Sequence, residues 1–185
     1  MTIPNLITIM RFLLVPCVVY ALLEGWTGWA FAGFILAGVS DGVDGFIARH
    51  LDQRSELGAY LDPMADKLLL VSVFVVLGLM GQLPLWLVVL AVSRDVLIVL
   101  AVVLSTVMHH PVHMRPLFVS KVNTTVQIVV AGLALARLSV WPAVDGVMPA
   151  LVAVSGLLTV ASAAAYLVAW LKHMGGARDG ESSSR

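Results

Sequence analysis

The sequence contains few charged residues and a single cysteine. Charged side chains make up 12% of the 185 residues, whereas a typical soluble domain has about 25%. So few charges cannot cover a water-facing surface, which argues against a soluble enzyme, a nucleic-acid-binding protein and a disordered chain. The 11 basic residues balance 11 acidic ones, so no net field would attract nucleic acid. The lone Cys17 excludes an intrachain disulfide.

Apolar residues dominate what remains. They form 60% of the chain, against about 45–50% in soluble domains. A membrane-spanning helix needs about 20 mostly apolar residues. Six segments qualify, over residues 4–23, 29–49, 57–80, 84–107, 117–137 and 147–171. The sequence therefore predicts an all-α integral membrane protein with six transmembrane helices. Residues 1–173 are predicted to form one transmembrane domain, and residues 174–185, rich in glycine and serine, a disordered tail.

Lysine and arginine are unevenly distributed between the predicted loops. Arg54, Arg115 and Lys121 fall on one side together with the basic residues of the C-terminus, whereas Arg137 is the one basic residue near the other side. Short cytoplasmic loops are enriched in Lys and Arg. We therefore expect a multi-pass protein with both termini in the cytoplasm, in a bacterial inner membrane.

Four aspartates lie within the predicted membrane segments, where an ionised carboxylate is costly unless it is paired, hydrated or metal-bound. Asp41 and Asp44 lie near the end of the second segment, and Asp62 and Asp66 near the start of the third. At about 100° per residue, the members of each pair project from one helix face. A short loop joins the two segments, so the pairs can face each other at the same depth.

Converging carboxylates repel one another strongly in a low-dielectric site, and divalent cations remove that repulsion. Oxygen ligands suit Mg²⁺, Mn²⁺ or Ca²⁺, and the absence of His and Cys from the cluster argues against zinc. Metals held by carboxylates and left partly open can bind a pyrophosphate. Arg49, at the end of the second segment, adds a guanidinium for phosphate oxygens. The alternative is a set of buried ion pairs or solvated helix ends.

The same region forms one continuous pattern, Asp41-x2-Asp44-Gly45-x2-Ala48-Arg49-x8-Gly58-x3-Asp62-x3-Asp66. At all eight fixed positions it resembles the signature of the CDP-alcohol phosphatidyltransferase family. The resemblance implies a six-helix membrane fold, a homodimer and two divalent ions, Mg²⁺ or Mn²⁺. It also implies an enzyme that transfers a phosphatidyl group from CDP-diacylglycerol to an alcohol and releases CMP.

The resemblance further assigns roles to individual residues. Asp41, Asp44 and Asp62 would bind metal, and Asp66 would bind metal and act as general base on the acceptor hydroxyl. The opening stretch resembles that of family members, with three polar residues on one face that can help to hold the diphosphate. The residues that would bind CDP are Asn5, Thr8, Arg11, Gly45, Ala48, Arg49 and Gly58.

Later segments bear on the acceptor alcohol. Ser93–Val96 and the stretch from Arg115 to Gln127 resemble the cardiolipin synthases of the family, which use phosphatidylglycerol. The phosphatidylglycerophosphate synthases, which use glycerol 3-phosphate, carry a second arginine about two turns further along the fourth helix. Here residues 97–104 are wholly apolar. Cardiolipin synthesis is thus the preferred prediction, and phosphatidylglycerophosphate synthesis is the alternative.

Three basic residues are candidates for the acceptor phosphate: Arg94, Arg115 and Lys121. Arg94 has the alternative role of a buried partner for Asp95 or for a metal-site carboxylate. Arg115 and Lys121 have the alternative role of loop charges at the membrane surface. The roles of Asp95, Lys67 and the histidines at 109, 110 and 113 stay open.

Two other classes of membrane protein also use intramembrane aspartates. Prenyltransferases bind a diphosphate through two aspartate-rich motifs, but they are longer and lack the Gly-x2-Ala-Arg arrangement. Transporters would place acidic residues deeper in the bundle and would carry an internal repeat. The sequence has neither feature, so both classes fit it less well.

Overall fold

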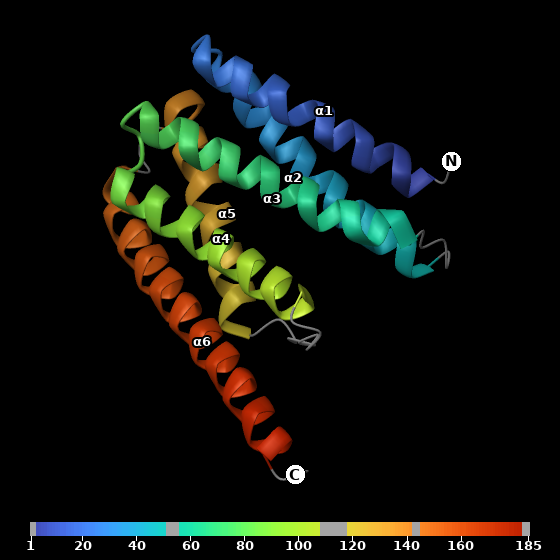
Figure 1. The fold of residues 1–185 in the computed structure, drawn as a ribbon. Coiled ribbons are helices and arrows are strands. Elements are labelled where there is room, and N and C mark those ends of the chain that lie inside the picture. Colours follow the sequence, from blue (N-terminus) through green and yellow to red (C-terminus); the bar gives the residue numbers. More distant parts are fainter. Residues whose placement is uncertain (1–2, 51–55, 108–117, 142–144, 183–185) are drawn as a thin grey trace. The chain divides into compact units, whose positions relative to one another are not determined.

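In the computed structural model of the protein, residues 3–50, 56–107, 118–141 and 145–182 are described, with side chains over 9–40, 64–101, 103, 118–141 and 145–171. Within these ranges the chain forms six α-helices and no strand (Figure 1). The helices are α1 (Ile3–Leu23), α2 (Thr27–His50), α3 (Glu56–Leu79), α4 (Leu85–Val107), α5 (Phe118–Ser139) and α6 (Met148–Ser182). The predicted all-α class and the six helical segments are thus confirmed.

Helix ends agree with the predicted ones within about two residues, except at the end of α6. This helix continues to Ser182, through most of the stretch that the sequence predicted to be a disordered tail. No proline follows Met148–Pro149 to stop it, and a helix that is already formed adds residues at low cost. Two glycines, Gly175 and Gly176, do not end it.

The chain divides into two compact units. Unit 1 comprises Met1–Leu85 and Ile128–Pro149, and unit 2 comprises Trp86–Gln127 and Ala150–Arg185. In unit 1, α1 packs against both α2 and α3. A Cβ atom on Gly33 of α2 would lie 2.7 Å from Val18 Cγ2 of α1, so any larger residue would force the Val18 side chain or the helices to shift.

Two short turns in unit 1 use glycine in the left-handed conformation. Gly25 follows α1 with φ 76°, and Gly81 follows α3 with φ 71°. The amide of Trp26 donates to the carbonyl of Ala21 at 2.7 Å, and Gln82 N–H donates to Leu77 O at 2.8 Å. These bonds form Schellman caps, which satisfy the last carbonyls of each helix without any longer loop.

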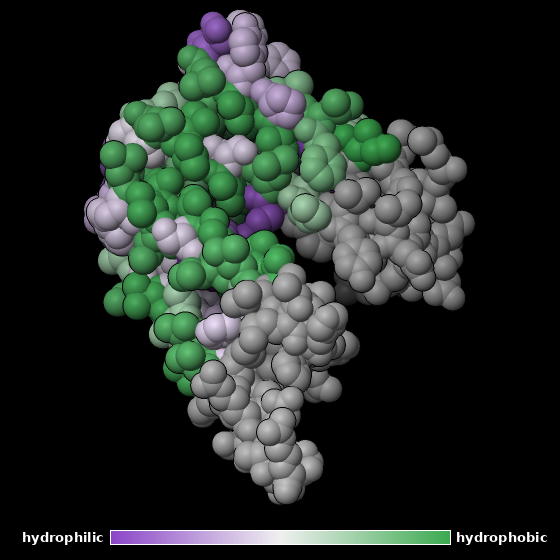
Figure 2. Space-filling model, viewed as in Figure 1, coloured by the Kyte–Doolittle hydropathy of each residue, from purple (hydrophilic) through white to green (hydrophobic). Residues whose placement is uncertain are grey.

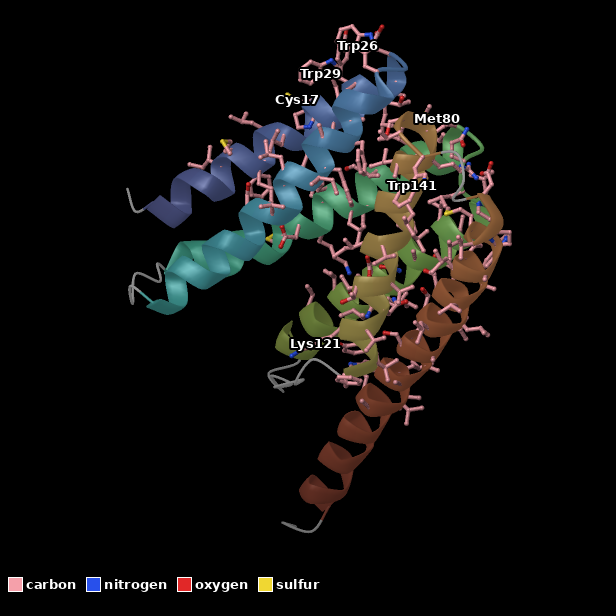
Figure 3. The ribbon with its side chains drawn as sticks, turned by 180° about the vertical axis from the view of Figure 1, so that it is seen from behind. Cys17, Trp26, Trp29, Met80, Lys121 and Trp141 are labelled. Atoms are coloured by element: carbon pink, nitrogen blue, oxygen red, sulfur yellow. The ribbon has the colours of Figure 1, made fainter. Side chains whose placement is uncertain are left out.

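The surface of the helices fits a membrane environment. In the described residues, two helical stretches are long and apolar enough to span a bilayer, Phe118–Ser139 and Met148–Leu171. Hydrophobic residues cover most of the described surface in Figure 2. Trp26, Trp29 and Trp141 of unit 1 are exposed and lie at helix ends (Figure 3). Tryptophan at these positions is typical of the interface between lipid and water.

The two units differ in what they bury. The described core of unit 1 consists of aliphatic and aromatic side chains such as Leu22, Phe34 and Leu135, with Arg11 as a charged exception. Unit 2 instead buries a run of polar side chains on three helices: Arg94 and Asp95 of α4, Asn123 and Gln127 of α5, and Ser155, Thr159 and Ser162 of α6. Polar contacts between helices replace the hydrophobic effect, which is weak inside a lipid bilayer.

Candidate active site

The backbone of α2 and α3 brings the four predicted aspartates to matching depths. Residues 51–55 connect the end of α2 to the start of α3. At about 1.5 Å per residue, Asp44 lies about 9 Å before the end of α2 and Asp62 about 9 Å after the start of α3. Asp41 and Asp66 lie about 14 and 15 Å from the same ends. The backbones of Asp44 and Asp62 therefore lie at similar distances from the α2–α3 connection, and so do those of Asp41 and Asp66.

Asp66 is the one aspartate of this set whose side chain lies within the described residues, and it contacts Arg11 of α1. The Arg11 Nη1 atom donates to Asp66 Oδ1 at 2.7 Å. Arg11 is buried, with 1% of its side chain exposed, whereas Asp66 is 41% exposed. The ion pair holds the Asp66 carboxylate against α1, while part of the side chain stays accessible to a ligand.

This donor set fits hard divalent cations. The pattern supplies aspartates from two helices and no His or Cys, and carboxylate oxygens are the ligands that Mg²⁺ and Mn²⁺ prefer. The side chains of Asp41, Asp44 and Asp62 lie outside the described ones. Among the side chains that are described, no group of three His, Cys, Asp or Glu residues comes together.

Most of the predicted CDP-binding residues also lie outside the described side chains. Their backbones lie in α1 for Asn5 and Thr8, in α2 for Gly45, Ala48 and Arg49, and in α3 for Gly58. Arg115, with the three histidines at 109, 110 and 113, falls in the stretch 108–117, outside the described residues altogether. The roles of these residues stay predictions.

Arg94 lies at the centre of a polar network in unit 2. It is buried, with 2% of its side chain exposed, and its Nη1 donates to Asp95 Oδ1 at 2.8 Å. The Ser162 hydroxyl of α6 accepts from Nε at 3.1 Å and from Nη2 at 2.7 Å. The Ser120 hydroxyl of α5 accepts from Nη2 as well. The Tyr166 ring lies 5.8 Å from the guanidinium carbon, within reach of a cation–π interaction.

The network joins all three helices of unit 2, and it realises one of the two roles predicted for Arg94, that of a buried partner of Asp95. A second set of bonds lies on the same helices, where Thr159 donates to Asn123 Oδ1 at 2.9 Å. Ser155, Thr159 and Ser162 were not predicted from the sequence. Their spacing of four and three residues, on one face of an otherwise apolar segment, is the signal that predicts them.

Lys121, another acceptor candidate, is exposed near the start of α5 (Figure 3). It lies one residue after Ser120, which contacts Arg94. Arg94 and Lys121 both belong to unit 2, whereas the aspartate pattern of α2 and α3 belongs to unit 1.

The family model for CDP-alcohol phosphatidyltransferase matches residues 1–171. The chain belongs to this family. The resemblance predicted from the eight-position pattern is thereby confirmed.

Named relatives within this family are similar over most of the chain. The human cardiolipin synthase (CMP-forming) is 36% identical over 151 residues, which cover 73% of this chain and 50% of the human protein. A Drosophila melanogaster protein named probable cardiolipin synthase (CMP-forming) is 34% identical over 185 residues, covering 91% of this chain and 57% of its own length.

A third relative carries the name of the alternative activity. The chloroplastic CDP-diacylglycerol–glycerol-3-phosphate 3-phosphatidyltransferase 1 of rice is 34% identical over 152 residues, covering 73% of this chain and 46% of the rice protein. The chain thus spans about half the length of the curated relatives that it matches.

Proposed function

We propose that this CDP-alcohol phosphatidyltransferase is a cardiolipin synthase, which transfers the phosphatidyl group of CDP-diacylglycerol to phosphatidylglycerol and releases CMP. The observation that carries the proposal is the aspartate pattern across α2 and α3, whose last member, Asp66, is held by Arg11 at 2.7 Å. A fixed and accessible carboxylate beside metal-binding carboxylates suits attack by an alcohol on a phosphorus atom.

In the proposed reaction, Asp66 accepts the proton of the acceptor hydroxyl. The hydroxyl oxygen forms a bond to the phosphorus that bears diacylglycerol, and the bond from that phosphorus to the CMP oxygen breaks. Two divalent ions, Mg²⁺ or Mn²⁺, held by Asp41, Asp44, Asp62 and Asp66, would neutralise charge on the phosphate oxygens and on the departing CMP. Arg11 keeps the Asp66 carboxylate oriented, and Asn5, Thr8, Arg49 and the small residues Gly45, Ala48 and Gly58 line the CDP site.

The choice of phosphatidylglycerol as acceptor rests on two observations. The human and Drosophila relatives are both named for cardiolipin synthesis. In addition, Arg94 of α4 is paired with Asp95 and followed by a wholly apolar stretch, so α4 lacks the two free cations that a small dianion would favour. Lys121 and Arg115 are the proposed contacts of the acceptor phosphate, whereas Arg94 is proposed to join α4 to α5 and α6.

The second candidate is phosphatidylglycerophosphate synthesis, with glycerol 3-phosphate as acceptor. It is supported by the rice relative, which is named for that reaction. Both reactions use the same donor and the same aspartates, so they differ only in the residues that receive the acceptor.

The same proposal includes the membrane topology. All six helices would cross the bilayer, because each contains about 20 mostly apolar residues, and the basic residues would place both termini in the cytoplasm of a bacterial cell. The aspartates near the α2–α3 connection would then lie at the cytoplasmic surface, where CDP-diacylglycerol exposes its head group. A homodimer in the inner membrane is the proposed assembly.

A product assay tests the proposed function. The purified protein, with Mg²⁺ or Mn²⁺ and CDP-diacylglycerol, is offered phosphatidylglycerol and glycerol 3-phosphate in separate reactions, and the lipid products are measured by mass spectrometry. We expect cardiolipin and CMP from the phosphatidylglycerol reaction alone. Phosphatidylglycerophosphate from the other reaction alone would assign the second candidate function.

Replacing a proposed metal ligand should change the metal requirement. Asp41→Ala removes one carboxylate from the set, so we expect the Mg²⁺ concentration for half-maximal activity to rise by about 10–100-fold, the range found when metal-site residues are altered. The check is a metal titration of initial rate with saturating CDP-diacylglycerol. Asp145→Ala, which removes an exposed carboxylate, serves as control. An unchanged titration curve for Asp41→Ala would contradict its assignment as a ligand.

A further inference from the structure

An apolar groove of about 460 Å³ lies between α4 and α6, within unit 2. Its walls include Leu90, Leu97 and Ala101 of α4 and Val160, Ala164 and Leu167 of α6. Figure 1 shows the two helices close together where they begin and further apart toward their other ends. The volume is in the range of about 300–1,000 Å³ that is typical of small-molecule sites.

The groove has the length of one membrane leaflet. On α6 it extends from Val160 to Trp170, which is about 15 Å at 1.5 Å per residue, and on α4 it extends from Leu90 to Ala101. A leaflet contributes half of a hydrocarbon core about 30 Å thick. One acyl chain of a phospholipid spans this distance. The length of a soluble ligand is not related to the thickness of a leaflet.

The position along the helices identifies the leaflet. The lining residues occupy the later part of α4 and of the apolar stretch of α6, which the distribution of Lys and Arg places toward the cytoplasm. Trp170 lines the end of the groove nearest to that surface. Tryptophan favours the depth of the lipid glycerol backbone, so a chain that enters beside Trp170 would have its head group at the cytoplasmic surface.

One polar residue, Arg94, lies part-way along the wall that α4 contributes, between Leu90 and Leu97. Arg94 is among the lining residues, but its nitrogens are directed to Asp95, Ser120 and Ser162, and Tyr166 covers its guanidinium. The arginine therefore offers the groove mainly its aliphatic stem, as buried arginines can. The walls are suited to methylene groups rather than to a phosphate.

We infer that this groove binds one acyl chain of the acceptor phospholipid. The inference rests on the proposed function, in which the acceptor is phosphatidylglycerol. It assigns the chain to the acceptor and not to the donor because the groove is built entirely from unit 2, which also contains the acceptor candidate Lys121. The aspartates and CDP-binding residues that define the donor belong to unit 1.

A groove-filling variant tests the inference. Ala164→Phe places a ring in the groove, and Val168→Phe places the same ring on an exposed part of α6 that does not line it. We expect Ala164→Phe to raise the KM for dioleoyl phosphatidylglycerol by about tenfold. This is the lower end of the range found when a group fits an apolar pocket poorly. The KM for CDP-diacylglycerol and the KM for dihexanoyl phosphatidylglycerol, whose chains are too short to fill the groove, should not change.

A second measurement uses the unsubstituted protein and does not depend on how the variants fold. Phosphatidylglycerol with a diazirine near the end of one acyl chain is photolysed in proteoliposomes, and the labelled peptides are mapped by mass spectrometry. We expect labelling of α4 and α6 at groove residues such as Leu97 and Leu167, reduced several-fold by excess unlabelled phosphatidylglycerol. CDP-diacylglycerol with the same diazirine should not label them.

The outcomes separate the two proposals. A protein that makes cardiolipin but shows equal KM values for Ala164→Phe and Val168→Phe, or labelling outside the groove, would overturn the inference and leave the proposed function intact. Groove labelling by the donor probe, or a rise in the donor KM alone, would also overturn it. If the protein used only glycerol 3-phosphate, the proposed function would be wrong. The inference that the groove binds an acyl chain of the acceptor would then be wrong as well, because that acceptor has no acyl chain.

Discussion

Asp66→Asn should lower kcat by about 10²–10⁴-fold, the contribution typical of a general base. The amide has the shape of the carboxylate and can still contact Arg11, but it cannot accept the proton of the acceptor hydroxyl. The protein should therefore remain folded and retain metal. The measurement is CMP release under saturating CDP-diacylglycerol and phosphatidylglycerol, together with the thermal midpoint of the purified variant and its metal content.

The matched control is Asp145→Asn. Asp145 is an exposed carboxylate that also pairs with an arginine, Arg137, at 3.2 Å. It lies outside the aspartate pattern, so its removal should leave kcat within a factor of two or so of the unsubstituted value, in line with the small effects of surface substitutions. If Asp66→Asn kept a turnover close to that of this control, Asp66 would not be the base.

Asp95→Ala should reduce the free energy of unfolding by about 3–5 kcal/mol, because it removes the charged partner of a buried arginine. Arg94 is 2% exposed and Asp95 9% exposed at the side chain, so water cannot replace the lost carboxylate easily. The network also joins α4 to α5 and α6 through Ser120 and Ser162, so unit 2 should loosen as a whole. Unfolding in mixed micelles, followed by tryptophan fluorescence, measures the change.

Two further variants show whether burial is the cause. The exposed pair of Arg137 and Asp145 provides the comparison, and Asp145→Ala should cost only about 0–1 kcal/mol. The double variant Arg94→Leu with Asp95→Ala should recover part of the loss, because no uncompensated charge then remains inside the bundle. Equal losses for the buried and the exposed carboxylate would show that the network contributes no more than a surface ion pair.

The helices could be predicted from the sequence because each one contains a long apolar run, and all but α6 end close to where that run ends. Gly25 and Gly81 mark the ends of α1 and α3, and both adopt the positive φ that a helix cap requires. The end of α6 could not be predicted in the same way. Its last residues are polar and contain glycine, but the helix that precedes them is long enough to extend through them.

The sequence could place residues of the candidate site on one helix face where they are close in sequence. Asp62 and Asp66 lie one turn apart, so their common face follows from helical geometry alone. The partner of Asp66 did not follow, because Arg11 is 55 residues away and only the packing of α1 on α3 brings the two together. The partners of Arg94 on α5 and α6 were missed for the same reason, while its neighbour Asp95 was anticipated.

In the proposed topology, the contact between Arg11 and Asp66 would also affect how the chain enters the membrane during synthesis. An arginine within an apolar helix costs about 2.5–3.5 kcal/mol on insertion, and α1 contains no acidic residue to offset it. The compensating carboxylate leaves the ribosome only with α3. We therefore expect α1 to rest shallowly, with its guanidinium in the head-group region, until α3 has been translated. Biogenesis of the first three helices then becomes a single cooperative event.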